Sequence, residues 1–258
     1  MEEWLRFLER VENFSLIEMT IVDSAILGIL QGLTEFLPVS SSGHLVLGQE
    51  FLGINQPGNS FEIIVHIGTL FSVLIFFRSD IFLLLNFSNQ QYSFKYIIYI
   101  MVGTLPAGVF GLIFKDSISL LFENRLVVGY SLIFTSLILF LSYFKKINNK
   151  EISLLIALII GCSQSIAIIP GISRSGITIC TAILLGVPAK AAARFSFMLA
   201  IPIITGAGFL NFIDTENIIE VPVLIGLVGF LSSFFVGLIA LKWLLSIIEK
   251  GNLYYFGI

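Results

Sequence analysis

Three ionisable side chains lie at or next to interruptions of otherwise apolar stretches: Glu35, His44 and Arg174. Charged groups are costly inside a bilayer, so each of them is a functional candidate. Gln31 and Glu35 are four residues apart, which places them on one helical face. A carboxylate there can act as a general base, a proton store or a ligand for a hard divalent cation such as Mg²⁺ or Ca²⁺. The alternative is that Glu35 only pairs with Arg174.

The segment around Arg174 has the composition of an anion-binding cradle. Gly171 and Gly176 allow the backbone to turn its N–H groups inward, and a predicted helix over 177–187 begins just after them. The guanidinium fork of Arg174 suits a phosphate, and the neighbouring hydroxyl donors are Ser173, Ser175 and Thr178. These residues predict a phosphate or pyrophosphate ligand. Close packing of small residues is the alternative, but it leaves the arginine unexplained.

The two histidines have unequal claims to chemistry. His44 follows Ser40, Ser41, Ser42 and Gly43. Among these hydroxyls it could be a nucleophile, a general acid or a general base, and the sequence does not choose. His66 lies inside a continuous apolar run between Val65 and Ile67, which favours a hydrogen-bonded packing role.

The composition places these residues in a membrane protein. Of the 258 residues, 57% are hydrophobic and 12% are charged, against roughly 45–50% and 25% in a soluble domain. The formal charge of -3 excludes a basic nucleic-acid binder. The two cysteines, Cys162 and Cys180, lie in apolar surroundings and are expected to be packed side chains.

Hydropathy predicts an all-α membrane fold in which two segments do not simply cross. The apolar segments are near 16–37, 62–77, 96–114, 126–144, 152–169, 177–187, 195–213 and 221–241. The first runs into the polar stretch 37–44, and the fifth runs into 169–176. Irregular backbone at membrane depth requires a protein or water-filled environment. Both breaks therefore predict re-entrant helical hairpins.

The two hairpins match each other at one offset. Residues Gly28, Gln31, Ser40, Ser42 and Gly43 recur 133 positions later as Gly161, Gln164, Ser173, Ser175 and Gly176. Three crossings separate the hairpins, so the second unit enters from the opposite face. This predicts an inverted-topology repeat within one membrane domain over 1–258, with units over about 16–148 and 149–258. The partner of span 126–144 is expected at about 259–277, past Ile258.

Positive charge predicts the orientation. One side of the predicted topology collects nine Lys and Arg residues: Arg78, Lys95, Lys145, Lys146, Lys150, Lys190, Arg194, Lys242 and Lys250. The other side has Arg6, Arg10, Lys115 and Arg125. The nine are expected to be cytoplasmic, so the mouth of the first hairpin faces outside. Residues 1–14 carry charges and one apolar stripe, which predicts an interfacial helix.

Two motifs resemble a known family. The stretch Gln31-Gly-Leu-Thr-Glu-Phe-Leu-Pro-Val-Ser-Ser-Ser-Gly-His44 and the stretch Pro170-Gly-Ile-Ser-Arg-Ser-Gly-Ile-Thr178 closely resemble the signatures of undecaprenyl-pyrophosphate phosphatases of the UppP/BacA type, the bacitracin-resistance proteins. The resemblance extends over nearly the whole chain.

The resemblance implies an enzyme of the bacterial inner membrane. It would hydrolyse a C55 polyprenyl pyrophosphate to the monophosphate, recycling the lipid carrier for cell-wall synthesis, with an outward-facing site and a divalent cation. The implied catalytic residues are Glu35, Ser41, His44 and Arg174, with Glu35 as metal ligand. The resemblance also implies roles at the substrate for Gln31, Ser173 and Thr178, and the composition of the two breaks adds Ser40, Ser42, Ser175 and Gly176 as predicted substrate-binding residues. The family's first motif position is often Glu and is Gln31 here, which leaves Glu35 and substrate oxygens to hold the cation.

A lipid transporter or flippase is the rival class, because inverted repeats with broken helices are typical of transporters. Glu35, His44 and the serines favour chemistry over passage, since a carrier needs anion donors but no acid–base pair. The expected partners are the polyprenyl pyrophosphate, the bilayer and a second copy of the chain in a homodimer, with no nucleic acid.

Overall fold

The computed structural model describes residues 19–54, 60–85, 94–122, 124–144, 149–213, 221–249 and 253–257. All regular structure in these ranges is helical. The interfacial helix predicted over 1–14 lies outside the described residues.

The first hairpin has two short helices. Helix α2 (Ile21–Thr34) begins at a capping box between Thr20 and Asp23. It ends before Pro38, and α3 (Ser41–Phe51) follows after the break. With 14 and 11 residues, neither helix is long enough to cross a bilayer alone.

The second hairpin repeats this pattern. Helix α9 (Leu154–Ile166) starts from the N-cap Ser153 and stops before Pro170. Helix α10 (Arg174–Leu184) starts from the N-cap Ser173. Both predicted breaks are therefore present between paired short helices.

Among the described residues, four helical segments are long and apolar enough to cross a membrane: Phe94–Ile113, Arg125–Phe144, Ala189–Leu210 and Val223–Glu249. They comprise α6 (Phe94–Ile113), α8 (Arg125–Leu141) with η1 (Ser142–Phe144), most of α11 (Ala189–Ile213), and α12 (Val223–Glu249). A fifth candidate is α4 (Ser60–Phe76) with α5 (Arg78–Leu85), which are bent by 69° at Phe77. The segment expected to cross at 62–77 therefore turns sharply at its end. The remaining short elements are α7 (Lys115–Phe122) and η3 (Leu253–Gly257).

The membrane-facing surface is apolar. Side chains on α6, α8 and α12 expose more than half their area, including Ile113 at 68%, Leu126 at 71% and Ile239 at 67%. Exposed apolar surface on this scale is incompatible with water and fits lipid tails. The chain is a multi-pass membrane protein.

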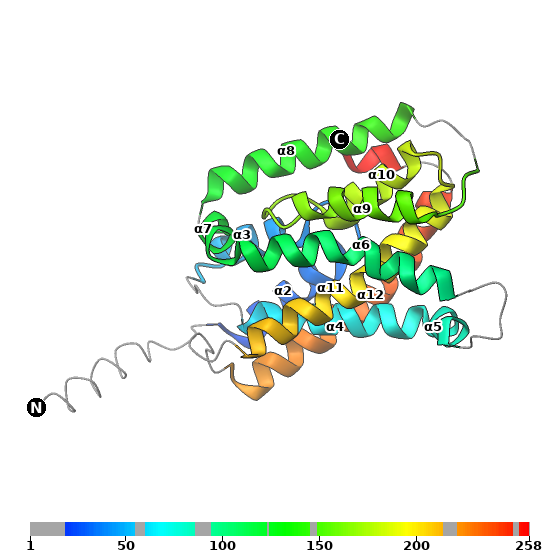
Figure 1. Ribbon diagram of the computed structural model, residues 1–258. Coiled ribbons are helices and arrows are strands. Elements are labelled where there is room, and N and C mark those ends of the chain that lie inside the picture. Colours follow the sequence, from blue (N-terminus) through cyan, green and yellow to red (C-terminus); the bar gives the residue numbers. More distant parts are fainter. Residues whose placement is uncertain are drawn as a thin grey trace, which may run out of the picture.

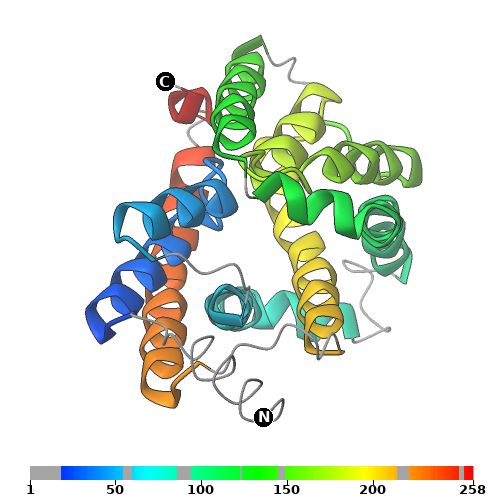
Figure 2. The same cartoon turned by 90° about the vertical axis from the view of Figure 1, so that its left-hand side faces the viewer.

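The helices form two packed groups joined at the centre. Helix α12 packs along α2 and α4, whereas α6 packs along α9. Figure 2 shows α2, α3 and α12 on one side and α6 with α9 on the other, with α4 and α11 between them. In Figure 1, α4, α6, α8 and α9 run roughly parallel.

Close backbone approaches require glycine at both helix crossings. A Cβ on Gly28 of α2 would lie 2.7 Å from the Gly229 carbonyl oxygen of α12. A Cβ on Gly161 of α9 would lie 2.6 Å from the Gly103 carbonyl oxygen of α6. Both helix pairs can approach this closely only because these positions lack side chains.

Ion pairs mark the two ends of the bundle. Arg125 at the start of α8 pairs with Glu50 near the end of α3 at 2.8 Å. Lys190 at the start of α11 pairs with Glu249 at the end of α12 at 2.6 Å. Arg125 and Lys190, which the sequence assigns to opposite sides of the membrane, therefore belong to separate ion pairs. Five of the other basic residues used for the orientation lie outside the described residues: Arg6, Arg10, Lys145, Lys146 and Lys250.

Candidate active site

The tip of the first hairpin places Glu35 at the end of α2. Its backbone N–H still donates to the Gln31 carbonyl at 2.9 Å, so the carboxylate projects from the helical face that Gln31 occupies. The turn continues through Ser40, whose φ of 69° is unusual for a non-glycine residue. Ser40 caps α3, because its hydroxyl accepts the Gly43 N–H at 3.4 Å.

The tip of the second hairpin mirrors this cap. The Ser173 hydroxyl accepts the Gly176 N–H at 3.0 Å, and its oxygen is 3.2 Å from the Ser175 hydroxyl oxygen. Ser40 and Ser42 have the same 3.2 Å oxygen–oxygen separation. All these serines therefore lie at helix starts and hold the turns.

The two tips touch each other. The Ser175 hydroxyl donates to the Leu37 carbonyl at 3.3 Å. A Cβ on Gly43 would lie 3.0 Å from the Cα of Gly171. The structure thus brings together breaks that are far apart in the sequence.

Glu35 is at the centre of this junction. Arg174 Nη2 donates to Glu35 Oε1 at 2.7 Å, and the two side chains are only 14% and 7% exposed. The other oxygen, Oε2, accepts from Ser41 Oγ at 2.6 Å and from Gln31 Nε2 at 3.0 Å. A hydroxyl donating to a buried carboxylate is the arrangement of a nucleophile with its general base. Glu35 therefore does more than pair with Arg174.

His66 also faces Glu35, which the sequence did not predict. Its Nε2 lies 3.6 Å from Glu35 Oε2, while its Nδ1 lies 2.7 Å from the Glu62 main-chain oxygen one turn earlier. The contact with the Glu62 carbonyl fits the predicted hydrogen-bonded packing role, and the approach to Glu35 is additional to it. The signal was absent from the sequence because the contact joins α4 to α2 across space.

His44 occupies a different environment. Its Nδ1 lies 2.8 Å from the Ser40 carbonyl oxygen, one turn back on α3. Among the contacts of the described residues, none joins His44 to Glu35 or Arg174. His44 is partly exposed beside the first tip, so it lies near the junction without bonding to its central pair.

Arg174 is supported from behind by α11. Its Nη1 donates to the Ser196 carbonyl at 3.4 Å, and the Ser196 hydroxyl oxygen lies 2.6 Å from Thr178 Oγ1. Thr178 is fully buried and also donates to the Arg174 carbonyl at 2.7 Å. The threonine expected to contact a ligand therefore lies behind the arginine and helps to hold it.

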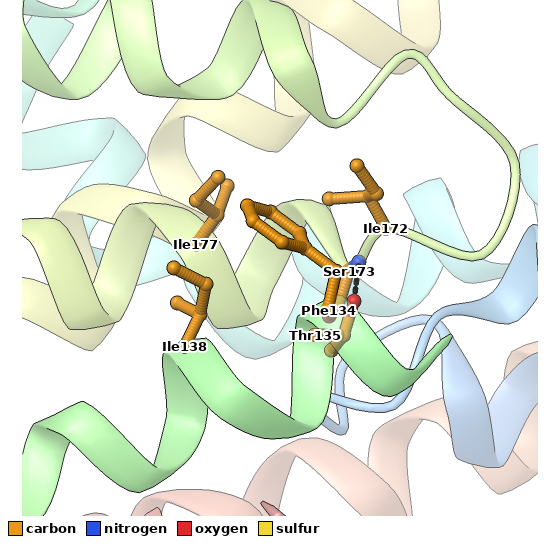
Figure 3. A pocket seen from close by; sticks show the side chains of 6 residues that line it. All are labelled: Phe134, Thr135, Ile138, Ile172, Ser173 and Ile177. Carbon is orange, nitrogen blue, oxygen red and sulfur yellow. Dashed lines mark hydrogen bonds between the residues drawn. The ribbon is translucent and has the colours of Figure 1, made fainter. Parts of the chain in front are cut away.

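A buried hydroxyl on α8 ties down the second tip. Thr135 Oγ1 donates to the Gly171 carbonyl at 2.9 Å and accepts the Ser173 N–H at 3.0 Å. Figure 3 shows the second bond at the edge of an apolar hollow that Phe134 and Ile177 help to line. This contact could not be predicted, because a single threonine within a span has no recognisable sequence pattern.

The junction offers oxygen donors to a divalent cation. Gln31 is fully buried, and its Oε1 has no hydrogen-bond partner. A buried carbonyl oxygen without a partner is unfavourable unless something else binds it. Within the described residues no three His, Cys, Asp or Glu side chains cluster as a metal site. Glu35 Oε2 and the Ser41 hydroxyl could nevertheless hold a hard cation that also takes oxygens from a ligand. Gln31 Oε1 would join them after a half-turn of its amide, because Nε2 is the atom that faces Glu35.

The family comparison agrees with the two motifs. Residues 24–258 match the family model described as bacitracin resistance protein BacA. The chain belongs to the BacA family. It is 42% identical to the undecaprenyl-diphosphatase of Parabacteroides distasonis over 250 residues, covering 93% of this chain and 94% of that protein.

Other relatives carry the same description. The chain is 41% identical to undecaprenyl-diphosphatase 1 of Bacillus licheniformis, covering 93% of this chain and 94% of the relative. It is 42% identical to the undecaprenyl-diphosphatase of Bacteroides fragilis, covering 92% of each. This BacA family member is thus similar to those enzymes over almost its full length.

Proposed function

We propose that this BacA family member hydrolyses undecaprenyl pyrophosphate to undecaprenyl phosphate and inorganic phosphate, as its relatives' names describe. The observation that carries the proposal is the Glu35 carboxylate at the junction of the two tips, bound to Arg174 through one oxygen and to Ser41 through the other. The three residues combine a positively charged arginine that can bind an anion with a serine hydroxyl and the carboxylate that can accept its proton. Recycling of the lipid carrier for cell-wall synthesis follows from this reaction.

Pyrophosphate binding is assigned to Arg174 and the start of α10. The guanidinium can bind two phosphate oxygens, and the helix N-terminus favours negative charge. Because Arg174 already binds Glu35, the incoming anion must share or replace that contact. Ser173, Ser175 and Gly176 shape the turn, and Thr178 holds the arginine from behind.

The chemical step begins at Ser41. Its hydroxyl donates to Glu35 at 2.6 Å, so Glu35 can take the proton as the serine oxygen attacks the terminal phosphorus. Undecaprenyl phosphate leaves, and water then releases the phosphate from the serine. Attack by His44 or by a water in place of the serine are the alternatives. Arg174 stabilises the charge that develops on the bridging oxygen.

A divalent cation, Mg²⁺ or Ca²⁺, is proposed at Glu35. Gln31 Oε1 and Ser41 are the neighbouring oxygen donors on this chain. When bound, the cation would neutralise charge on the substrate oxygens.

We further propose that the two hairpins belong to inverted repeat units over about 16–148 and 149–258. Three features support the symmetry: the matched serine caps, the glycine crossings at Gly28 and Gly161, and the partnerless amide oxygens of Gln31 and Gln164. The positive residues of the sequence favour an active site that faces outside the cytoplasm. The expected homodimer stays a prediction, which the mass of the purified protein in detergent measures.

Phosphate release from the lipid substrate in detergent tests the function. The wild-type protein should turn over, whereas Arg174→Ala and Glu35→Ala should be inactive. Full activity in either variant would overturn the site assignment, and an inactive wild-type protein would overturn the function.

The transporter alternative predicts a different result. A flippase would move undecaprenyl phosphate across liposomes even in a Glu35 variant that cannot hydrolyse. The Ser41–Glu35 contact favours the enzyme, since transport needs no nucleophile bound to a base.

A further inference from the structure

The imidazole of His66 lies beside the same oxygen of Glu35 that accepts from Ser41 and Gln31. We propose that His66 is a nitrogen ligand of the divalent cation, from α4, so that the site prefers a transition ion such as Mn²⁺ over Ca²⁺. The inference deepens the cation site of the proposed function and rests on it.

The backbone contact of His66 sets its tautomer. Nδ1 lies 2.7 Å from the Glu62 carbonyl oxygen, which can only accept, so Nδ1 carries a proton. In the neutral ring, Nε2 then presents its lone pair towards Glu35. Histidine ligands of metals are typically oriented in this way, by a carbonyl bound to the other ring nitrogen.

The separation from Glu35 fits shared binding of an ion. His66 Nε2 and Glu35 Oε2 are 3.6 Å apart, beyond an ordinary hydrogen bond. While the imidazole is neutral, these two atoms are both acceptors, and a cation bound between them would relieve their repulsion. Donors that are each about 2.1 Å from one metal lie about 3.0 Å apart at a right angle and about 3.4 Å apart at a tetrahedral angle. A small inward movement of His66 is therefore enough.

The neighbours of Glu35 are divided between its two carboxylate oxygens. Arg174 occupies Oε1, whereas His66 and Gln31 both lie on the side of Oε2. The Gln31 amide is 3.0 Å from Oε2 through Nε2, while its Oε1 has no partner. Rotation of the amide by a half-turn would exchange these atoms and bring two oxygens together, which a cation between them would favour.

The candidate ligands differ in exposure. His66 is 29% exposed, whereas Glu35 is 7% exposed and Gln31 is fully buried. The imidazole is therefore the candidate ligand nearest the surface of the protein.

The donor types determine which ion is preferred. One carboxylate, one amide oxygen and one imidazole give a set with less charge and a softer donor than the carboxylate-rich sites of Ca²⁺. Divalent transition ions accept imidazole readily, and Mn²⁺ also accepts oxygen donors. The replacement of a carboxylate by Gln31 in the first motif strengthens this preference.

Electron paramagnetic resonance of Mn²⁺ bound to the full chain in detergent tests the proposal. The chain has two histidines, so His44 is the matched control, and the protein must carry no histidine tag. We expect the wild-type protein and His44→Ala to bind Mn²⁺ with a directly coordinated ¹⁴N in pulsed spectra. His66→Ala should lose the nitrogen coupling and bind Mn²⁺ about tenfold or more weakly. Ca²⁺ displacement of Mn²⁺ should become easier by a similar factor.

The proposal is overturned if wild-type protein binds no Mn²⁺, if bound Mn²⁺ shows no nitrogen, or if His44→Ala removes the nitrogen and His66→Ala does not. His66→Gln, with thermal unfolding recorded for each variant, separates loss of the ligand from loss of the fold. Phosphate release by the wild-type protein is measured separately. Its absence would refute the proposed function, whereas intact turnover without a nitrogen ligand would refute this inference alone.

Discussion

The Glu35 carboxylate divides its two oxygens between two tasks. Oε1 is committed to Arg174, and Oε2 accepts from Ser41 and Gln31. Charged groups buried to this degree are tolerated only when such partners satisfy them. The same contacts that stabilise the buried charge of Glu35 also place its carboxylate between the proposed anion-binding site and the Ser41 hydroxyl.

Glu35→Gln tests whether the negative charge of Glu35 is needed, because the substitution removes the charge and keeps the size of the side chain. The amide keeps the size of the side chain but cannot take the Ser41 proton, so phosphate release should fall by about 10²-fold or more. Thermal unfolding temperatures in detergent should fall for both Glu35→Gln and Arg174→Ala, because each variant leaves one member of a buried ion pair without its counter-charge. Near wild-type turnover in Glu35→Gln would exclude a role as general base.

Arg174→Lys tests the fork geometry. Arg174 reaches Glu35 through Nη2 and Ser196 through Nη1, and a lysine has one nitrogen for both. We expect kcat/KM for the lipid pyrophosphate to fall by about 10²-fold. Arg194→Lys is the control, because Arg194 forms its ion pair with Asp80 and not with Glu35. Equal losses in both variants would contradict a specific role for Arg174.

At the scale of elements, α8 restrains the second tip through one hydroxyl. Thr135→Val keeps the shape but removes the acceptor of the Ser173 N–H and the donor to Gly171. Leaving these buried groups unpaired should lower the free energy of unfolding by about 1–3 kcal/mol and reduce kcat, because Arg174 follows Ser173 directly. Thr135→Ser should restore both. A variant without either effect would show that the tip does not depend on α8.

The helix crossings give a second test of the elements. Gly161→Ala places a Cβ 2.6 Å from the Gly103 carbonyl oxygen, so α9 must move away from α6. We expect a loss of about 1–3 kcal/mol in unfolding free energy. Gly108→Ala on α6 has nothing within 4 Å and serves as the control. Equal melting temperatures of the two variants in detergent would contradict the tight crossing.

The sequence predicted elements and breaks better than contacts. Proline and polar residues interrupting apolar runs are local signals, so both breaks could be predicted, and Glu35 and Arg174 could be selected as candidates that the structure then brings into contact. The approach of His66 to Glu35 and of Thr135 to Ser173 joins different helices, and no spacing along the chain encodes it. Thr178 was expected to contact the ligand because it carries a hydroxyl group. In the structure its position on α10 directs the side chain towards Ser196 of α11, behind Arg174.

At the scale of the whole molecule, the fold places the irregular backbone of the two tips where protein surrounds it. The long helices α6, α8, α11 and α12 present apolar side chains outward, while the tips lie against one another and against α8. Each hairpin thus satisfies backbone groups that lipid could not. The polar junction is a consequence of this enclosure, and it is where charged chemistry can be sustained inside a membrane.

Sided labelling tests how this molecule sits in the bilayer. Phe51 ends α3 at the end of the bundle marked by the Glu50–Arg125 pair and is 90% exposed, whereas Tyr143 lies beyond α8 at the opposite end and is 62% exposed. In a Cys162→Ser background, Phe51→Cys should react with an impermeant maleimide on intact cells with the outer membrane opened, because the positive residues place this end outside. Tyr143→Cys should react only after the inner membrane is permeabilised. The reverse labelling pattern would mean that the Ser41–Glu35 junction is reached from the cytoplasmic side. It would not contradict the proposed chemistry, because hydrolysis in detergent does not depend on the orientation of the protein.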